Sequence, residues 1–454
     1  MPLQEIRLPH LDTYNFGVGV DRLSGTAMNQ VVNPTPSAPL MAAGASQSFE
    51  VARISSTQDL QQKLGIDVSA SYGCASFGAG VSGRFQFAQD SQVHSASLFM
   101  SVTASVHLAD LSIADCVLTS SASAVADRPD IFTDRYGNMF LRACKRGGLF
   151  VGLLRVETFD ETEATSIEAE LRGSYGMFSA DASTKFSKAT SDHNASMYCT
   201  IYKEGGPAVV INDPTDPKQF LDAANAWITA MYAESDKYAE PYEWTLSPIT
   251  IAEGPMPLNT ADIQHAQDVL TFCTQQRAAL LDQLNLLNWW SLHQDRYDWT
   301  GAATPAQVTQ AATATQADLD TIAACASAAI DSPKDAVMPA DYAAAHSKKY
   351  PAAQLPTPAP KPKPGAAAPV TTAAAPIPTP NFVGKHLDEA RLIAKGANVT
   401  VDEGDLREFL ENYTDRDGTV HRALPPNAIT ITAQDPAPGH LILPGGSVQL
   451  EGRP

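Results

Sequence analysis

The sequence predicts an α+β fold in which helices lie beside a long β-sheet that bends. Three observations support this prediction. Apolar and polar residues alternate over residues 96–108, which indicates an unusually long strand. The pair Gly147-Gly148 follows a second strand-like run, and two adjacent glycines inside a strand usually mark a bend or a bulge. Apolar residues then recur at helical spacing from Thr260 past Leu292.

The first part of the chain predicts short elements followed by a repeated pattern. Residues 60–64 suggest a short helix after an irregular start. Two later stretches, about a hundred residues apart, share a pattern. In each, the apolar residues occupy alternate positions up to a Ser-Tyr-Gly, at residues 71–73 and 174–176. After that tripeptide the alternation continues shifted by one residue. Each stretch ends in a similar tetrad, residues 94–97 and 193–196. Since a one-residue phase change moves the apolar set to the other face of a strand, each switch predicts a bulge or a new element.

The strand over residues 96–108 is the clearest single element. Its even-numbered residues are apolar and its odd-numbered residues are polar, with Phe99 as the exception. The apolar face consists of Ala96, Leu98, Met100, Val102, Ala104, Val106 and Leu108. We expect this strand to lie next to a strand over residues 140–156.

The central motif runs from Phe132 to Phe150, with an aromatic residue before a Tyr-Gly, a strand-like run and a glycine pair. This arrangement resembles the core of the membrane attack complex/perforin (MACPF) family, which carries an aromatic residue, a Tyr-Gly-Thr-His-aromatic run and a glycine pair in its bent central sheet. The matching residues are Phe132, Tyr136, Gly137, Phe140, Gly147 and Gly148. Asn138 and Met139 stand in place of the family's Thr-His. The alternative interpretation is an ordinary turn followed by a bulged strand.

The resemblance covers roughly residues 15–255 and implies a MACPF-like domain over residues 1–255. Its fold would be a bent, twisted antiparallel sheet flanked by helices, similar to those of the MACPF and cholesterol-dependent cytolysin proteins, with Gly147-Gly148 as the hinge. The family also has two insertions that fold up in the soluble form and become membrane-spanning β-hairpins, and residues 75–93 and 178–192 occupy their places. The candidate membrane residues are Phe77, Ala79, Val81, Phe85, Phe87, Phe178, Ala180, Ala182 and Phe186.

Helices are predicted for a region over residues 256–350 and for the segment before it. Asp216-Pro217 suits the start of one helix, Thr260 could cap a second, and Thr304-Pro305 opens a third. The tryptophans at 289, 290 and 299 are either core residues or membrane anchors, and the core is the favoured interpretation.

A linker and a small domain follow. Residues 351–380 are almost all Pro, Ala, Thr and Lys, which predicts a semi-rigid spacer. Residues 380–390 and 434–439 resemble the opening and the QxPxPG turn of a PASTA domain, which predicts a PASTA-like domain over residues 381–454. That resemblance implies a bacterial cell-wall ligand. The alternative is a stabilising or assembly tail.

Composition and motifs exclude several classes of protein. The 454 residues suggest two to four domains, and a net charge of −19 argues against nucleic acid as a partner. No apolar run approaches the roughly 20 residues of a transmembrane helix. The six cysteines lack the spacing of a zinc site, and buried free thiols are expected. The GxGxxG at residues 78–83 lies in a strand-like pattern rather than before a helix, so no cofactor is predicted. Catalytic residues and metal ligands are likewise predicted to be absent.

The leading hypothesis is a membrane-inserting, pore-forming protein of the perforin-like type, which assembles into an oligomeric ring and carries a C-terminal targeting module. The alternative is a non-lytic binding or assembly protein on the same scaffold. A membrane hairpin needs two strands of about 9–11 residues, and the candidate segments are barely that long even when flanking strand residues join them, which favours the alternative. The N-terminus shows no classical signal peptide, so we expect a soluble protein, released by another route, that meets lipid conditionally. The expected partners are a lipid membrane, other copies of the chain and a surface ligand of residues 381–454.

Overall fold

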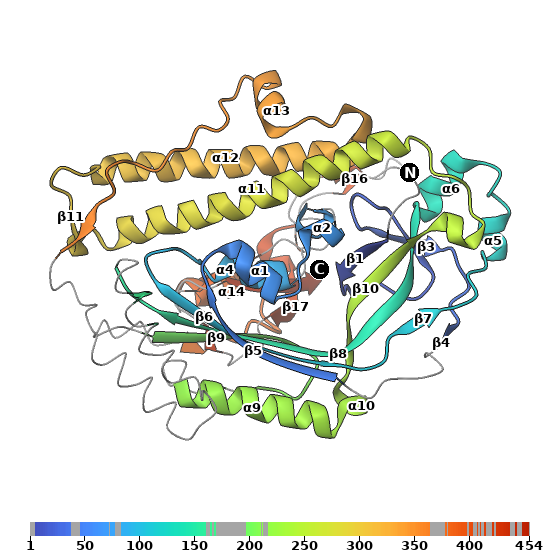
Figure 1. The fold of residues 1–454 in the computed structure, drawn as a ribbon, viewed down its shortest axis with the longest axis horizontal. Helices are drawn as coiled ribbons and strands as arrows, with labels where there is room; N and C mark the ends of the chain where they lie inside the picture. The colour runs from blue at the N-terminus through green and yellow to red at the C-terminus, as the bar shows by residue number, and fades with distance from the viewer. Residues whose placement is uncertain are drawn as a thin grey trace. The chain divides into compact units, whose positions relative to one another are not determined.

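The computed structural model describes residues 5–37, 46–71, 73–77, 83–159, 164–165, 168, 197–209, 211, 217–363, 377–378, 380–396, 399–402, 406, 409, 413–414, 420–421, 424–435, 441–442 and 447–453. The chain divides into two compact units, Met1–Pro369 and Val370–Pro454. Figure 1 shows the helices and strands of both.

The first unit is built on a ten-stranded sheet in which every pairing is antiparallel. Its strands are β1 (Ile6–Pro9), β2 (Val18–Val20), β3 (Ala27–Gln30), β4 (Pro36–Ser37), β5 (Ser46–Ile54), β6 (Leu98–His107), β7 (Leu111–Ile113), β8 (Met139–Val156), β9 (Met197–Glu204) and β10 (Glu240–Pro248). Helices flank the sheet (Figure 1). The predicted α+β class, with a large antiparallel sheet flanked by helices, is confirmed.

The helices of this unit precede, interrupt and follow the strands. They are α1 (Thr57–Lys63), α2 (Val68–Ser71), α3 (Cys74–Phe77), α4 (Gly83–Asp90), α5 (Ser120–Ser123), α6 (Pro129–Tyr136), α9 (Pro217–Ala233), α10 (Ser235–Tyr238), α11 (Thr260–Leu292), α12 (Pro305–Asp331) and α13 (Pro339–Ala345), with short 3₁₀ turns η1 (Ile249–Ala252), η2 (Gln294–Arg296) and η3 (Pro333–Asp335). None of the helices in the described ranges is both long enough and apolar enough to cross a membrane.

Strand β8, 18 residues long, is the spine of the sheet. Its first half pairs with β10, from Met139 opposite Pro248 to Gly147 opposite Glu240. Its second half lies between β6 and β9. The predicted pairing of residues 96–108 with 140–156 is therefore confirmed, in a register that sets Val106 opposite Gly148.

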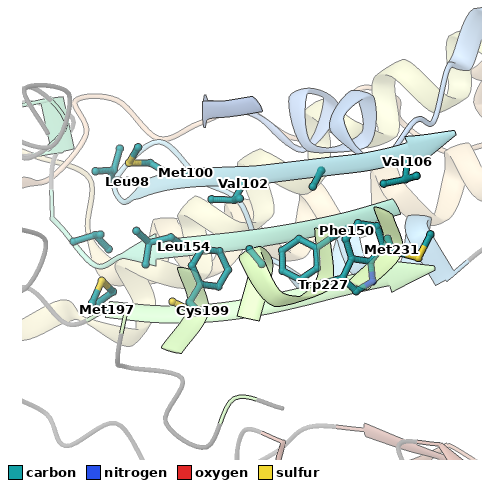
Figure 2. Packing of buried hydrophobic residues seen from close by; sticks show 14 of the residues in the cluster. Leu98, Met100, Val102, Val106, Phe150, Leu154, Met197, Cys199, Trp227 and Met231 are labelled. Carbon is teal, nitrogen blue, oxygen red and sulfur yellow. The ribbon is translucent and has the colours of Figure 1, made fainter. Parts of the chain in front are cut away.

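The part of the sheet formed by β5, β6, β8 and β9 has a core on each face. On one face, the even-numbered apolar residues of β6 pack with Phe150 and Leu154 of β8 against α9, where Trp227 lies beside Phe150 (Figure 2). On the other face, Phe99 packs with residues of α1 and α4. The exception in the alternation, Phe99, is thus apolar because the second face of the strand is also covered.

The pattern read as strand-like over residues 66–87 forms helices in its described part instead, namely α2, α3 and α4. Because α4 begins at Gly83, the GxGxxG at residues 78–83 is followed by a helix, and its placement within a strand is wrong. The apolar side chains of this stretch pack against the sheet, among them Leu60, Ile66 and Phe85. Short helices can bury such side chains as well as a strand can. Helix α3 begins at Cys74, directly after the phase switch at residues 71–73, so the prediction of a new element there is confirmed and the interpretation as a strand bulge is wrong. The equivalent switch at residues 174–176 lies outside the described residues.

The three predicted long helices are confirmed as α9, α11 and α12. Thr304 caps α12 in a capping box, with its side chain accepting from Gln307 N and Gln307 reaching back to Thr304 N. Thr260, in contrast, is the first residue of α11 rather than its cap, because Asn259 occupies the cap position in a left-handed conformation. Trp289 and Trp290 are buried, so the core interpretation holds for both.

Residues 351–363, the first part of the predicted linker, belong to the first unit. The amides of Ala352 and Ala353 donate to the carboxylate of Asp318 at 2.9–3.0 Å. Strand β12 (Lys361–Pro362) pairs with β11 (Tyr297–Asp298). This part of the chain is therefore anchored rather than extended.

The second unit has a three-stranded sheet in the order β14 (Thr400–Asp402), β19 (Ser447–Arg453) and β17 (Thr430–Asp435), with helix α14 (Leu387–Gly396) packed on it. Short pairs join β13 (Ile377–Pro378) to β18 (Leu441–Ile442) and β15 (Tyr413–Thr414) to β16 (Val420–His421), and η5 is Pro426–Ala428. The amide of Gln434 bonds the backbone of Phe382 and Pro380. The two segments that resemble a PASTA domain are thus in contact, and the PASTA-like domain stays a prediction.

Candidate functional site

The candidate site is the point where β8 changes partners. Gly147 is the last residue of β8 that pairs with β10 and the first that pairs with β6, where it lies opposite His107. Its φ of +149° is one that side-chain-bearing residues rarely adopt. A Cβ at Gly147 would lie 1.8 Å from Val106 O. The strand can therefore turn from one set of partners to the other only with glycine at this position.

Gly148 permits a close approach of helix α9 to the sheet. A Cβ on Gly148 would lie 2.7 Å from Met231 Cε and 2.8 Å from Trp227 Cζ2. Trp227 itself is fully buried, and its indole nitrogen donates to Gly205 O at 3.1 Å, just past the end of β9. The bend is therefore fixed from one face by a tryptophan that contacts β8 and the β9 terminus together.

From the other face, Arg84 of α4 holds the bend. Its guanidinium donates to both carboxylate oxygens of Glu204, through Nε at 2.7 Å and through Nη2. It also donates to Leu64 O at 3.0 Å and to Tyr242 O at 2.7 Å. Because Arg84 is 1% exposed, these bonds are made away from water. One side chain thus connects α4 to the end of α1, to β9 and to β10.

Two tyrosines complete this polar cluster. The hydroxyl of Tyr202 donates to Glu204 Oε1 at 2.6 Å. Burial, and to a smaller extent the negative charge of Glu204, raises the pKa of the Tyr202 phenol. The hydroxyl of Tyr242 forms a hydrogen bond with His107 Nδ1. Burial, and to a smaller extent the negative charge of Glu243, raises the pKa of the Tyr242 phenol. Burial, with a further contribution from Lys145, lowers the pKa of His107. The cluster is therefore set to keep both phenols protonated and His107 neutral at physiological pH.

A second arginine, Arg277 of α11, contacts helices α3 and α4. Its guanidinium lies 4.9 Å from the ring centre of Phe85 and 5.4 Å from that of Phe77. It donates to Gln89 Oε1 at 3.0 Å and to Ser76 O at 3.4 Å. Helix α4 is thus held to the sheet by Arg84 and to α11 by Arg277, and Arg277 also holds α3.

The predicted membrane residues fall into two groups. Phe85 is buried, Phe77 and Phe87 are partly buried, and Phe87 packs on Tyr202 with ring centres 5.6 Å apart. The structure therefore places these three aromatic side chains inside the α3–α4 region that the two arginines hold. The other predicted membrane residues, Ala79, Val81, Phe178, Ala180, Ala182 and Phe186, lie outside the described residues.

The matched family motif lies at the other end of β8. Phe132 and Tyr136 of α6 and Phe140 of β8 are buried in one cluster, with the first two rings 5.2 Å apart. Gly137, at φ +73°, lets the backbone of β2 approach, since a Cβ there would lie 2.3 Å from Val20 O. Asn138, which departs from the motif, is buried and accepts a hydrogen bond from Arg22 N at 3.0 Å. These residues build the base of the bent strand rather than the bend itself.

Sequence reasoning found the glycine pair but missed Arg84, Glu204 and Arg277. A charged residue inside an otherwise small and aromatic segment, as at Arg84, was the available signal. The partners could not be identified because Arg84 and Glu204 are 120 residues apart in sequence. Within the described ranges no group of His, Cys, Asp and Glu is placed to hold a metal ion, and Cys144, Cys273 and Cys325 are buried free thiols.

Comparison with known proteins gave structural similarities alone. No protein-family profile and no curated protein matches this chain. Among solved structures, stonustoxin is similar at a TM-score of 0.42 and 10% identity, over 72% of this chain and 42% of that one. A protein with a MAC/Perforin domain from Bacteroides thetaiotaomicron is similar at 0.30 and 12%, over 57% and 60%. The human-specific toxin intermedilysin is similar at 0.30 and 10%, over 56% and 62%. This chain thus spans less than two thirds of each of these proteins.

Proposed function

We propose that this protein is a membrane-inserting, pore-forming protein that assembles into an oligomeric ring. The observation that carries the proposal is the order of four neighbouring antiparallel strands, β5, β6, β8 and β9. The connection between β5 and β6 and the connection between β8 and β9 both leave from the same end of this four-stranded part. There, Ile54 pairs with Phe99 and Val156 pairs with both Leu98 and Met197.

Each connection contains enough chain to form a membrane hairpin. Residues 55–97 and 157–196 comprise about forty residues each, so a hairpin of two strands of about 20 residues is available, against the 9–11 that a bilayer requires. The segments 75–93 and 178–192 would form the membrane part, and the residues flanking them would continue the strands down to the sheet. The two hairpins are therefore long enough to cross a bilayer when the residues flanking these segments also leave their folded positions and join the strands.

Two features of the sheet would serve insertion and assembly. The bend at Gly147 lets the four-stranded part open relative to the half that pairs with β10. Within the described residues, β5 pairs only with β6 and β9 pairs only with β8, so each has a free edge. The β5 edge of one copy pairing with the β9 edge of the next would satisfy the backbone in lipid, where unpaired polar groups are not tolerated.

Leakage measurements test this proposal. The full chain is added to vesicles of phosphatidylcholine with cholesterol or with phosphatidylglycerol, and dye release is followed while the vesicles are examined by electron microscopy. Release accompanied by rings is the expected outcome. Binding or assembly without release in any of these vesicles would instead support the non-lytic alternative, which the polar residues Arg84, Gln86, Gln89 and Asp90 of α4 favour.

We further propose that the second unit is a targeting module. A small domain joined by a Pro- and Ala-rich segment raises the local concentration of its partner unit at a surface without sharing its machinery. Retention on peptidoglycan is compared for the full chain and for a variant that ends at residue 369. Equal retention of the two would eliminate the targeting role.

A further inference from the structure

A buried histidine lies at the joint between α4 and β6. His94 is 3% exposed, stacks on the Trp289 ring of α11 at 5.0 Å and meets Phe99 of β6 edge-on at 5.6 Å. Neither of its ring nitrogens has a hydrogen-bond partner within the described residues. The side chain therefore fits this place as a neutral aromatic ring, and a charge on it would have no acceptor.

A guanidinium and a second histidine lie against the same indole. Arg155 of β8 lies 5.1 Å from the ring centre of Trp289, and its carboxylate partner is Glu157 at 3.3 Å. The ring of His293, just past α11, lies tilted against Trp289 with ring centres 3.8 Å apart, and Asp295 and Arg296 of η2 face it in turn. Protonation of both histidines would thus add two charges beside one buried guanidinium, with Glu157 and Asp295 as the nearby carboxylates.

The electrostatics favour an acid response with a definite sign. Burial, and then Arg155 and His293, hold the pKa of His94 well below its usual value, and burial and Arg155 lower that of His293. The closed arrangement therefore binds fewer protons than an open one. As the pH falls below about 6.5, each histidine favours opening by up to about tenfold per pH unit, until the lowered pKa is reached.

The joint connects the clamped helices to the strand that would extend. Val93 packs with Phe85 and Ala88 of α4, and its carbonyl accepts from Asn285 Nδ2 of α11 at 3.1 Å. Strand β6 begins at Leu98, four residues after His94, where Leu98 pairs with Val156. Separation of residues 91–97 from α11 is thus the first step by which β6 could lengthen at the expense of α4.

We propose that His94, with Trp289, Arg155 and His293, is an acid-sensitive joint whose protonation detaches residues 83–97 from α11. The detachment is a property of the folded chain in solution. Its use as a trigger for insertion rests on the proposed function.

Hydrogen–deuterium exchange of the full chain in solution, without lipid, tests the joint. Peptides covering residues 83–97 are compared at pH 7 and pH 5, with labelling times corrected for the intrinsic exchange rate. We expect the wild type to lose at least about tenfold in protection at pH 5. His94→Phe fills the same aromatic space without a titratable group, and His94→Gln is a second neutral variant. Both should lose clearly less protection than the wild type, because only His293 still titrates at the joint, whereas His346→Gln, at an exposed position, should behave like the wild type.

Two results would overturn the inference. One is a wild type whose residues 83–97 stay equally protected at both pH values. The other is an acid-induced loss that persists unchanged in the neutral variants that fold. Dye release measured in parallel separates this test from the proposed function, because exchange that responds to acid in a protein that never leaks refutes pore formation and leaves the joint standing.

Discussion

Removal of the Arg84 guanidinium should release α4 from the sheet. In Arg84→Met, the apolar stem is kept while four hydrogen bonds are lost, two to Glu204 and one each to Leu64 O and Tyr242 O. Among the described residues, the hydroxyl of Tyr202 is then the remaining side-chain partner of Glu204, whose side chain is 19% exposed. Breaking a buried ion pair by removing one partner typically costs about 3–5 kcal/mol, and we expect a loss in this range.

The matched variants separate the ion pair from simple loss of packing. In the double variant Arg84→Met/Glu204→Gln no charge is left buried without a partner, so part of the lost stability should return. Lys237→Met breaks a pair with Glu234 on the surface, where side chains are more than half exposed, and should change stability little.

Urea unfolding measures the stability of these variants, and the lag before dye release measures the freedom of α4. Arg84→Met should unfold at lower urea and shorten the lag, because the helix no longer has to break these bonds before it leaves the sheet. An unchanged urea midpoint would show that Arg84 does not hold the folded state. A lag that lengthens despite lower stability would show that the guanidinium acts during insertion rather than against it.

Three further outcomes are expected. Gly147→Ala should cost about 3 kcal/mol or more, because the new methyl overlaps Val106 O, whereas Gly301→Ala, also at positive φ but with open space around it, should cost about 1 kcal/mol by urea unfolding. Trp227→Phe, which loses the bond to Gly205 O, should cost about 1–3 kcal/mol, and an unchanged thermal midpoint would refute its role at the bend. Burial raises the pKa of Asp282 to about 6, although the amide and the hydroxyl of Thr57 both donate to its carboxylate. The folded state therefore binds this proton more tightly than the unfolded state does, and the free energy of unfolding rises as the pH falls. Asp282→Asn should therefore be more stable than the wild type at pH 7, and this advantage should shrink by about 1 kcal/mol at pH 5; a constant difference would contradict the argument.

The sequence alone determined the elements whose signal is local. The alternation over β6, the glycine pair in β8 and the proline-led starts of α9 and α12 each depend on a few adjacent residues, whose period or φ restriction is written in the chain. The motif residues Phe132, Tyr136 and Phe140 were identified for the same reason. Their position at the base of β8 rather than at its bend was not evident.

Tertiary structure decided the state of residues 66–90 and the partners of the site. Apolar residues at alternate positions are typical of a strand. Here short helices bury the same side chains, because they pack against one face of the sheet and contact α11 and two arginines. Arg84 with Glu204, and His94 with Trp289, meet across 120 and 195 residues of sequence. Such pairs are selected by burial and by the low-dielectric surroundings that make an unpaired charge costly, and neither exists until the sheet has formed.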